Sequence, residues 1–162
     1  MAFQTYLSIT GTRQGLISAG CSTEASIGTR YRSAHCDEIM VLSFSHQLAN
    51  LDNTQVVSHE PVILTKLIDK ATPLLAQALT ERELVECKFS FYRINASGHH
   101  EKYLSIKLSG GMIIKLHLDV PHSVLLNDQD AQEHVAIRYR DISWNHHAAG
   151  TSGHAAWGHL AW

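Results

Sequence analysis

Alternation of apolar and polar positions dominates the chain and predicts β-strands over most of its length. The clearest pair of segments is 84–94 and 99–108, which flank the turn sequence Asn95-Ala96-Ser97-Gly98. In both segments the apolar residues recur at every second position. They are Val85, Cys87, Phe89 and Phe91 in the first segment, and Leu104, Ile106 and Leu108 in the second. Two alternating runs joined by a short turn that ends in glycine predict an antiparallel β-hairpin.

Two segments nearer the N-terminus alternate as well, and they differ in how many faces are apolar. Segment 3–9 has one apolar face, formed by Phe3, Leu7 and Ile9. Segment 39–44 has two. They are formed by Met40, Leu42 and Phe44 on one side, and by Ile39 and Val41 on the other. A strand that is apolar on both faces is expected to be covered on both.

Two later segments alternate with an irregularity. After Gly110-Gly111, the sequence MIIKLHL places one apolar set on a single face, namely Met112, Ile114, Leu116 and Leu118. In segment 134–146 the apolar residues first occupy odd positions, at Val135, Ile137 and Tyr139. They then change to even positions, at Ile142 and Trp144. A change of parity within one strand predicts a β-bulge near Arg140-Asp141.

One segment has a helical period instead. In KLIDKATPLLAQALTERE, apolar residues recur at the spacing of one helix face, at Leu74, Leu75, Ala78 and Leu79. Thr72 followed by Pro73 is typical of a helix N-cap and first position, which predicts a helix from about Pro73 to Glu81. Many strands and one helix without a βαβ rhythm predict a mainly β fold. We expect a single domain over residues 1–162, a two-sheet β-barrel or sandwich with one packed helix at about 73–81.

Charge and cysteine content limit the possible partners and compartments. Of the 162 residues only 17% are charged, the formal net charge is -2, and no block of Lys and Arg occurs. This excludes nucleic acid as the main partner, and a weakly charged surface favours self-association. Three cysteines without a C-x-x-C pair predict free thiols in a reducing compartment. Without a signal-peptide pattern or a run of ~18 apolar residues, we expect cytoplasmic synthesis, no membrane span and export by another route.

The histidine-rich stretch SWNHHAAGTSGHAAWGHLAW raises the question of a metal site. It carries His146, His147, His154 and His159, out of twelve histidines in the chain. Adjacent residues on a strand point to opposite faces, so His146 and His147 cannot reach one ion together. The others lack the spacing of helical zinc motifs. The sequence predicts no metal site and no cofactor, and these histidines are interpreted as solvated or interface residues.

A nucleophile is the other chemistry to test. Gly150-Thr151-Ser152-Gly153 lacks the G-x-S-x-G spacing, and no amphipathic helix follows it. The group His35-Cys36-Asp37-Glu38 combines a thiol, a histidine and two acids. It leaves one alternative open, a small metal- or thiol-dependent hydrolase or a ligand-binding β-barrel. Otherwise no catalytic residue is predicted, and the protein is interpreted as a binding or assembly module rather than an enzyme. Trp157 either marks a contact surface or packs back onto the fold.

The order and spacing of short motifs resemble the Hcp family, the haemolysin-coregulated proteins that form the inner tube of the type VI secretion system. The matching positions are Gln14-Gly15, Ser26-Ile27-Gly28, His35, Asp37-Glu38, His46, His59, Pro61, DKATPLL (69–75), Tyr92-Arg93, Gly98, Pro121-His122, Tyr139, Ile142, Trp144, GTSG (150–153) and Trp157. Two positions depart from the family pattern: Cys36 stands where Glu is usual and His154 where Asp is common.

The resemblance implies a two-sheet barrel with a helix on one side and a structural, non-enzymatic role. Such proteins close into homohexameric rings, which stack into a tube that is expelled and can carry small effectors. The implied partners are further copies of the chain, the sheath proteins, the spike protein and effectors. The implied location is the cytoplasm before firing and the exterior afterwards. GTSG is expected to turn the backbone and Trp157 to anchor the tail. The candidates for assembly or loop contacts are His35, Asp37, Glu38, His46, His59 and Trp157.

Overall fold

A computed structural model describes residues 3–50 and 56–158, and strands make up most of its secondary structure. The strands are β1 (Phe3–Gly11), β2 (Gly15–Leu16), β3 (Ile39–Ser45), β4 (Leu48–Ala49), β5 (Ser58–His59), β6 (Val62–Leu67), β7 (Leu84–Ile94), β8 (His100–Asp119), β9 (Gln132–Arg138), β10 (Asp141–His146) and β11 (Thr151–Ala156). The helices are α1 (Glu24–Ile27) and α2 (Thr72–Thr80), with short 3-10 turns at Gly28–Arg30 and Ser33–His35. The predicted mainly β fold is confirmed. The short helix α1 was not predicted.

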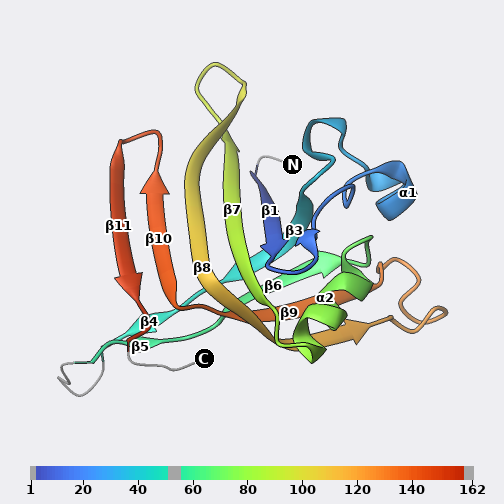
Figure 1. The fold of residues 1–162 in the computed structure, drawn as a ribbon. Coiled ribbons are helices and arrows are strands. Elements are labelled where there is room, and N and C mark those ends of the chain that lie inside the picture. The colour runs from blue at the N-terminus through green and yellow to red at the C-terminus, as the bar shows by residue number, and fades with distance from the viewer. Residues whose placement is uncertain (1–2, 51–55, 159–162) are drawn as a thin grey trace.

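Nine of the described strands form one sheet that bends back on itself (Figure 1). Its order is β11-β10-β8-β7-β1-β3-β6-β9, with β2 beside β1, and β9 pairs a second time with β8. The pairing therefore closes into a ring through β8, β7, β1, β3, β6 and β9, while β10 and β11 extend from one edge of β8. In place of two packed sheets there is this single curved sheet and a separate two-stranded ribbon of β4 and β5.

The hairpin of β7 and β8 is confirmed, and β8 is longer than its alternation suggested. It runs without interruption through Gly110-Gly111, pairing with β10 before the glycines and with β9 after them. A Cβ atom at Gly111 would lie 2.9 Å from the carbonyl oxygen of Val85, so glycine permits the close approach of β7 at this bend. A register shift between Ile113 and Lys115 then changes the parity that faces the core, so that Ile113 packs inward before it and Leu116 after it. As a result Ile113 is buried and Ile114 is exposed.

Two other parity expectations are corrected in the same way. The slip near Arg140-Asp141 is a break between β9 and β10, not a bulge inside one strand. A bulge does occur in β3, where the register shifts between Val41 and Ser43. It brings Phe44 onto the core side that Ile39 and Val41 occupy, and it leaves Leu42 exposed. Apolar residues of both parities in this strand therefore pack against the same core. Phe3, expected on an inner face, is 71% exposed.

Helix α2 lies against the sheet as predicted, from Thr72 to Thr80, and buries Leu75 and Ala78. Leu79 is partly buried and packs against the same core. The predicted N-cap is wrong: Ala71 occupies the N-cap position, and no side chain caps the helix. The Thr72 hydroxyl instead accepts the backbone N–H of Asp69 at 3.1 Å. It also donates to the Glu133 carboxylate at 2.9 Å.

A charged group that the sequence reading did not identify lies inside this core. The Lys66 side chain is fully buried, and its ammonium contacts Glu133 Oε2 at 2.6 Å and Asp69 Oδ1 at 3.0 Å. Because Lys66 shares strand parity with Val62 and Leu64, the alternation of β6 sends it inward. Burial raises the pKa of the Asp69 carboxyl, and Lys66 beside it acts in the opposite direction. The network joins β6, β9 and the start of α2.

No helix in the described part of the chain is long and apolar enough to cross a membrane.

Candidate functional site

Three of the predicted contact residues meet around the side chain of one buried tyrosine, Tyr139. His46 Nε2 lies 2.8 Å and His59 Nδ1 2.7 Å from this hydroxyl. The Trp157 indole stacks on the His59 ring, with centroids 5.6 Å apart, and meets the Tyr139 ring edge-on at 4.8 Å. We call His46, His59, Tyr139 and Trp157 the Tyr139 cluster.

The cluster joins segments that are far apart along the chain. Tyr139 occupies the break between β9 and β10 and is fully buried. His46 and His59 belong to the arm, which we define as residues 46–50 and 56–60 and which carries β4 and β5 (Figure 1). Trp157 follows β11, and its backbone N–H donates to the Arg140 carbonyl at 2.8 Å. Of the two alternatives for Trp157, packing back onto the fold is the one observed. The residue anchors the tail, which we define as residues 151–158.

The electrostatics of the cluster favour neutral imidazoles. Burial lowers the pKa of His46, and the neighbouring His59 lowers it further, against a hydrogen bond to the Glu60 backbone. Burial likewise lowers the pKa of His59, against a hydrogen bond to the Ala156 backbone. Burial raises the pKa of the Tyr139 hydroxyl. The sequence named both histidines and Trp157 as contact candidates. It did not show the role of Tyr139, which stood out only by its place at the parity slip and among the positions that match the Hcp pattern.

The second predicted group, around His35, is divided by the structure. The His35 ring stacks on Tyr6 with centroids 3.8 Å apart, and its Nδ1 lies 3.0 Å from Glu38 Oε1. Asp37 is turned to another partner and accepts the backbone N–H of Gly20 at 3.0 Å. Cys36 is an exposed free thiol. The hydrogen bonds of the described residues include none between this thiol and an imidazole, so the arrangement holds a loop and forms no nucleophile–base pair.

The tail histidines are dispersed rather than gathered. His146 Nδ1 accepts the Ala149 N–H at 3.0 Å, and His147 Nε2 lies 2.9 Å from Ser105 Oγ. His154 is 3.9 Å from an Asp141 oxygen, and His159 lies outside the described residues. Within residues 3–50 and 56–158, no three His, Cys, Asp or Glu side chains are grouped as a metal would require.

The expected turn at Gly150-Thr151-Ser152-Gly153 is only partly correct. The turn consists of residues 147–150, and Gly150 ends it with a positive φ of 72°. Thr151, Ser152 and Gly153 belong to β11, which pairs with β10 along its length. This strand was not predicted, because its small and polar residues are nearly all exposed and show no alternation.

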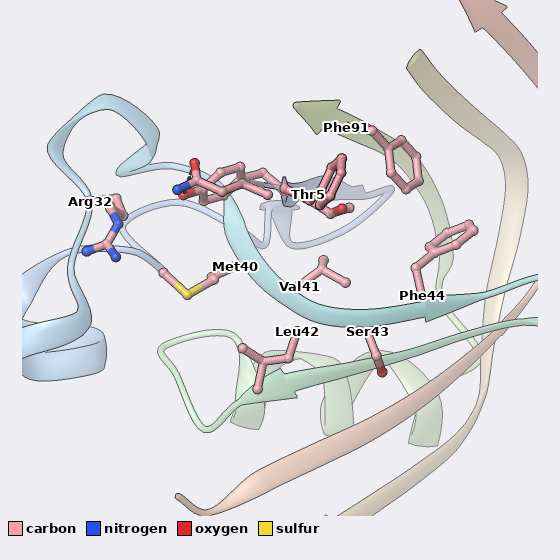
Figure 2. Close-up of a pocket in the computed structure, with 11 residues that line it drawn as sticks. Thr5, Arg32, Met40, Val41, Leu42, Ser43, Phe44 and Phe91 are labelled. Atoms are coloured by element: carbon pink, nitrogen blue, oxygen red, sulfur yellow. Dashed lines mark hydrogen bonds between the residues drawn. The ribbon is translucent and has the colours of Figure 1, made fainter. Parts of the chain in front are cut away.

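An apolar hollow opens where β1 and β3 separate (Figure 2). The two strands pair only between Thr5–Leu7 and Ile39–Val41, after which β3 turns toward β6. The hollow has a volume of about 340 Å³. Figure 2 shows Arg32 at one side and Phe44 and Phe91 at the other, with Met40 and Leu42 between them. Such a lining suits an apolar side chain of a neighbouring protein and offers no acid–base pair for catalysis.

Comparison with known proteins gives consistent matches over nearly the whole chain. The family model described as "Type VI secretion system effector, Hcp" matches residues 6–146. The "Major exported protein" of Pseudomonas aeruginosa is 39% identical over 171 residues, which cover 97% of this chain and 96% of that protein. A structure described as "Crystal structure of Hcp protein" superposes with a TM-score of 0.91 at 35% identity, over 98% of this chain and 100% of that one. The secreted protein Hcp3 from Pseudomonas aeruginosa gives a TM-score of 0.86 at 38% identity, with 96% and 99% covered.

Proposed function

Because the chain belongs to the Hcp family of the type VI secretion system, we propose that its copies close into homohexameric rings that stack into the inner tube. The whole chain, 1–162, acts as a single Hcp-like domain. The tube is expelled on firing and carries small effectors in its channel. The observation that carries this proposal is the family match over residues 6–146 together with the close superposition on Hcp structures.

The surface of the chain suits a head-to-tail ring. Such a ring requires two different surfaces that meet their counterparts on neighbouring copies. Here β11 ends the sheet on one side, and the apolar hollow between β1 and β3 lies several strands away in the sheet order. Large apolar side chains are exposed at positions that include Phe3 and Leu42. Because only 17% of the residues are charged, electrostatic repulsion between neighbouring copies is weak.

The same family membership supports the partners and the location. The tube is enclosed by sheath proteins and carries the spike protein at its tip. The protein is cytoplasmic before firing and outside the cell afterwards. Relatives named as a major exported protein and as a secreted protein support export.

The six candidate residues act by fixing loops that take part in assembly. His35 and Glu38 hold the loop ahead of β3 against Tyr6. Asp37 ties this loop to Gly20. His46, His59 and Trp157 hold the arm and the tail against Tyr139.

Ring formation has a direct test. Native mass spectrometry or light scattering at micromolar concentration in physiological salt is expected to give about six times the chain mass of 18.0 kDa. A monomer under these conditions would contradict the ring.

We propose further that the protein is not an enzyme. His35→Ala and Cys36→Ala are each expected to leave folding intact and to remove no hydrolytic activity, since His35 bonds Glu38 and no hydrogen bond within the described residues joins an imidazole to the Cys36 thiol. Metal analysis after purification without an affinity tag is expected to give less than one equivalent per chain. A stoichiometric metal, or ester or peptide hydrolysis lost in Cys36→Ala, would favour the hydrolase alternative.

A further inference from the structure

The Tyr139 cluster has four hydrogen bonds to satisfy and too few protons when both imidazoles are neutral. His46 bonds the Tyr139 hydroxyl and the Glu60 backbone. His59 bonds the same hydroxyl and the Ala156 backbone. A neutral imidazole has one N–H and one lone pair, and a hydroxyl has one hydrogen. Two rings and one hydroxyl thus supply three hydrogens for four bonds.

The position of the missing hydrogen follows from the acceptors. A backbone carbonyl can only accept, so each ring uses its N–H there and turns its lone pair to Tyr139. The hydroxyl hydrogen satisfies one lone pair and leaves the other without a donor. One added proton would supply the fourth hydrogen, but burial opposes the charge that it carries, so both imidazoles are neutral at neutral pH. A second would make both rings donors to the hydroxyl oxygen, leave the hydroxyl hydrogen without a ring acceptor, and place two positive charges on either side of one oxygen.

The surroundings also oppose a second proton. On β9 the Arg138 guanidinium lies 5.1 Å from the Trp157 ring centroid. At the break after β9, Arg140 pairs with Asp141, which also lies 3.9 Å from His154 of β11. On the arm, Glu60 is exposed, so solvent screens its carboxylate. The cluster is therefore stable with at most one charge on its two imidazoles.

We propose that the Tyr139 cluster is an acid-sensitive device that holds the arm and the tail at neutral pH and releases both when His46 and His59 are doubly protonated. The release belongs to the folded chain itself, so it goes beyond the proposed tube function and does not depend on it. The connection is direct, because His46 and His59 lie near the two ends of the arm and Trp157 anchors the tail on the His59 ring.

The sign of the pH dependence follows from burial. Both histidines have a pKa below the ordinary value of about 6.5, so the unfolded chain binds more protons than the folded one as the pH falls. The stabilisation is complete above about pH 6.5 and is lost as the pH falls through the lowered values. Arm and tail are therefore expected to open at mildly acidic pH.

Hydrogen exchange read by mass spectrometry tests this on the full chain. After correction for intrinsic rates, peptides of the arm and of residues 151–158 are expected to lose protection at least about tenfold between pH 7.5 and pH 5. Peptides of β7 are expected to stay protected. An even loss over the whole chain, or no loss in the arm and tail, would overturn the proposal.

Variants then assign the effect to the cluster. The double variant His46→Gln/His59→Gln carries neutral amides and is expected to show the same arm and tail exchange at both pH values. His99→Gln, at a turn where His99 is exposed, is the matched control and is expected to keep the wild-type response. An unchanged response in the double variant would refute the assignment. If the double variant does not fold, NMR titration of the wild-type imidazoles decides, because ordinary pKa values for both rings would refute it.

Discussion

Lys66→Met is expected to lower the free energy of unfolding by about 3–5 kcal/mol, because it leaves the buried carboxylates of Glu133 and Asp69 without their cation. Methionine fills a similar volume, so the loss of packing is small and the unpaired charge dominates. The ammonium also donates to the Leu67 carbonyl at 3.1 Å, and that contact is lost as well. Such a cost is a large share of the 5–15 kcal/mol that is typical for a whole domain.

Urea unfolding followed by circular dichroism measures this change. Lys88→Met is the matched control, since Lys88 is an exposed lysine on strand β7 and its replacement is expected to change stability by less than about 0.5 kcal/mol. Lys66→Met/Glu133→Leu removes the ion pair as a whole and is expected to recover part of the loss. Equal stability of Lys66→Met and the Lys88→Met control would show that Lys66 is hydrated in solution.

Strand pairing was predictable from sequence where alternation is regular and local. The β7–β8 hairpin follows from its two alternating runs and the turn that ends at Gly98. The helix follows from its apolar spacing and from Pro73, within one residue at each end. Both depend on contacts that are close in sequence, so short-range pattern is sufficient to identify them.

The errors lie where one residue changes the parity of a strand. The bulges at Leu42 and Ile114 change which parity of β3 and β8 faces the core, and both residues are apolar like their neighbours, so the sequence does not mark them. Strand β11 lacks alternation because it is an exposed edge strand, which a sheet can support with polar residues. Lys66 was missed because a buried charge is visible only when its partners are known, and Glu133 is 67 residues away.

The candidate site was predictable in its members and not in its arrangement. His46, His59 and Trp157 were named individually, but pattern cannot show that they meet at Tyr139. Their meeting depends on the break between β9 and β10, which turns Tyr139 toward the arm. Conversely, His35, Cys36 and Asp37 are adjacent in sequence and have different partners in the structure. Adjacency in the chain is therefore a poor guide to chemistry in this fold.

Leu75→Ala is expected to cost about 2–5 kcal/mol of unfolding free energy, since Leu75 is buried where α2 lies on the sheet and its truncation leaves a cavity. Thr72→Ala is also expected to lower the unfolding free energy, but not through the loss of a helix cap. It removes the hydroxyl that donates to Glu133 and accepts the Asp69 N–H, and it is expected to cost about 1–3 kcal/mol.

Thr72→Ser separates these two explanations, because serine keeps the hydroxyl and is expected to stay near wild-type stability. Urea midpoints of the three variants are expected to rank with Leu75→Ala lowest, Thr72→Ala next and Thr72→Ser highest. All three are expected to form rings once folded, because Leu75 is buried in the core and the Thr72 hydroxyl faces Glu133 inside the same chain. A Leu75→Ala variant as stable as wild type would mean that α2 does not cover the core, and the placement of this helix would then be wrong.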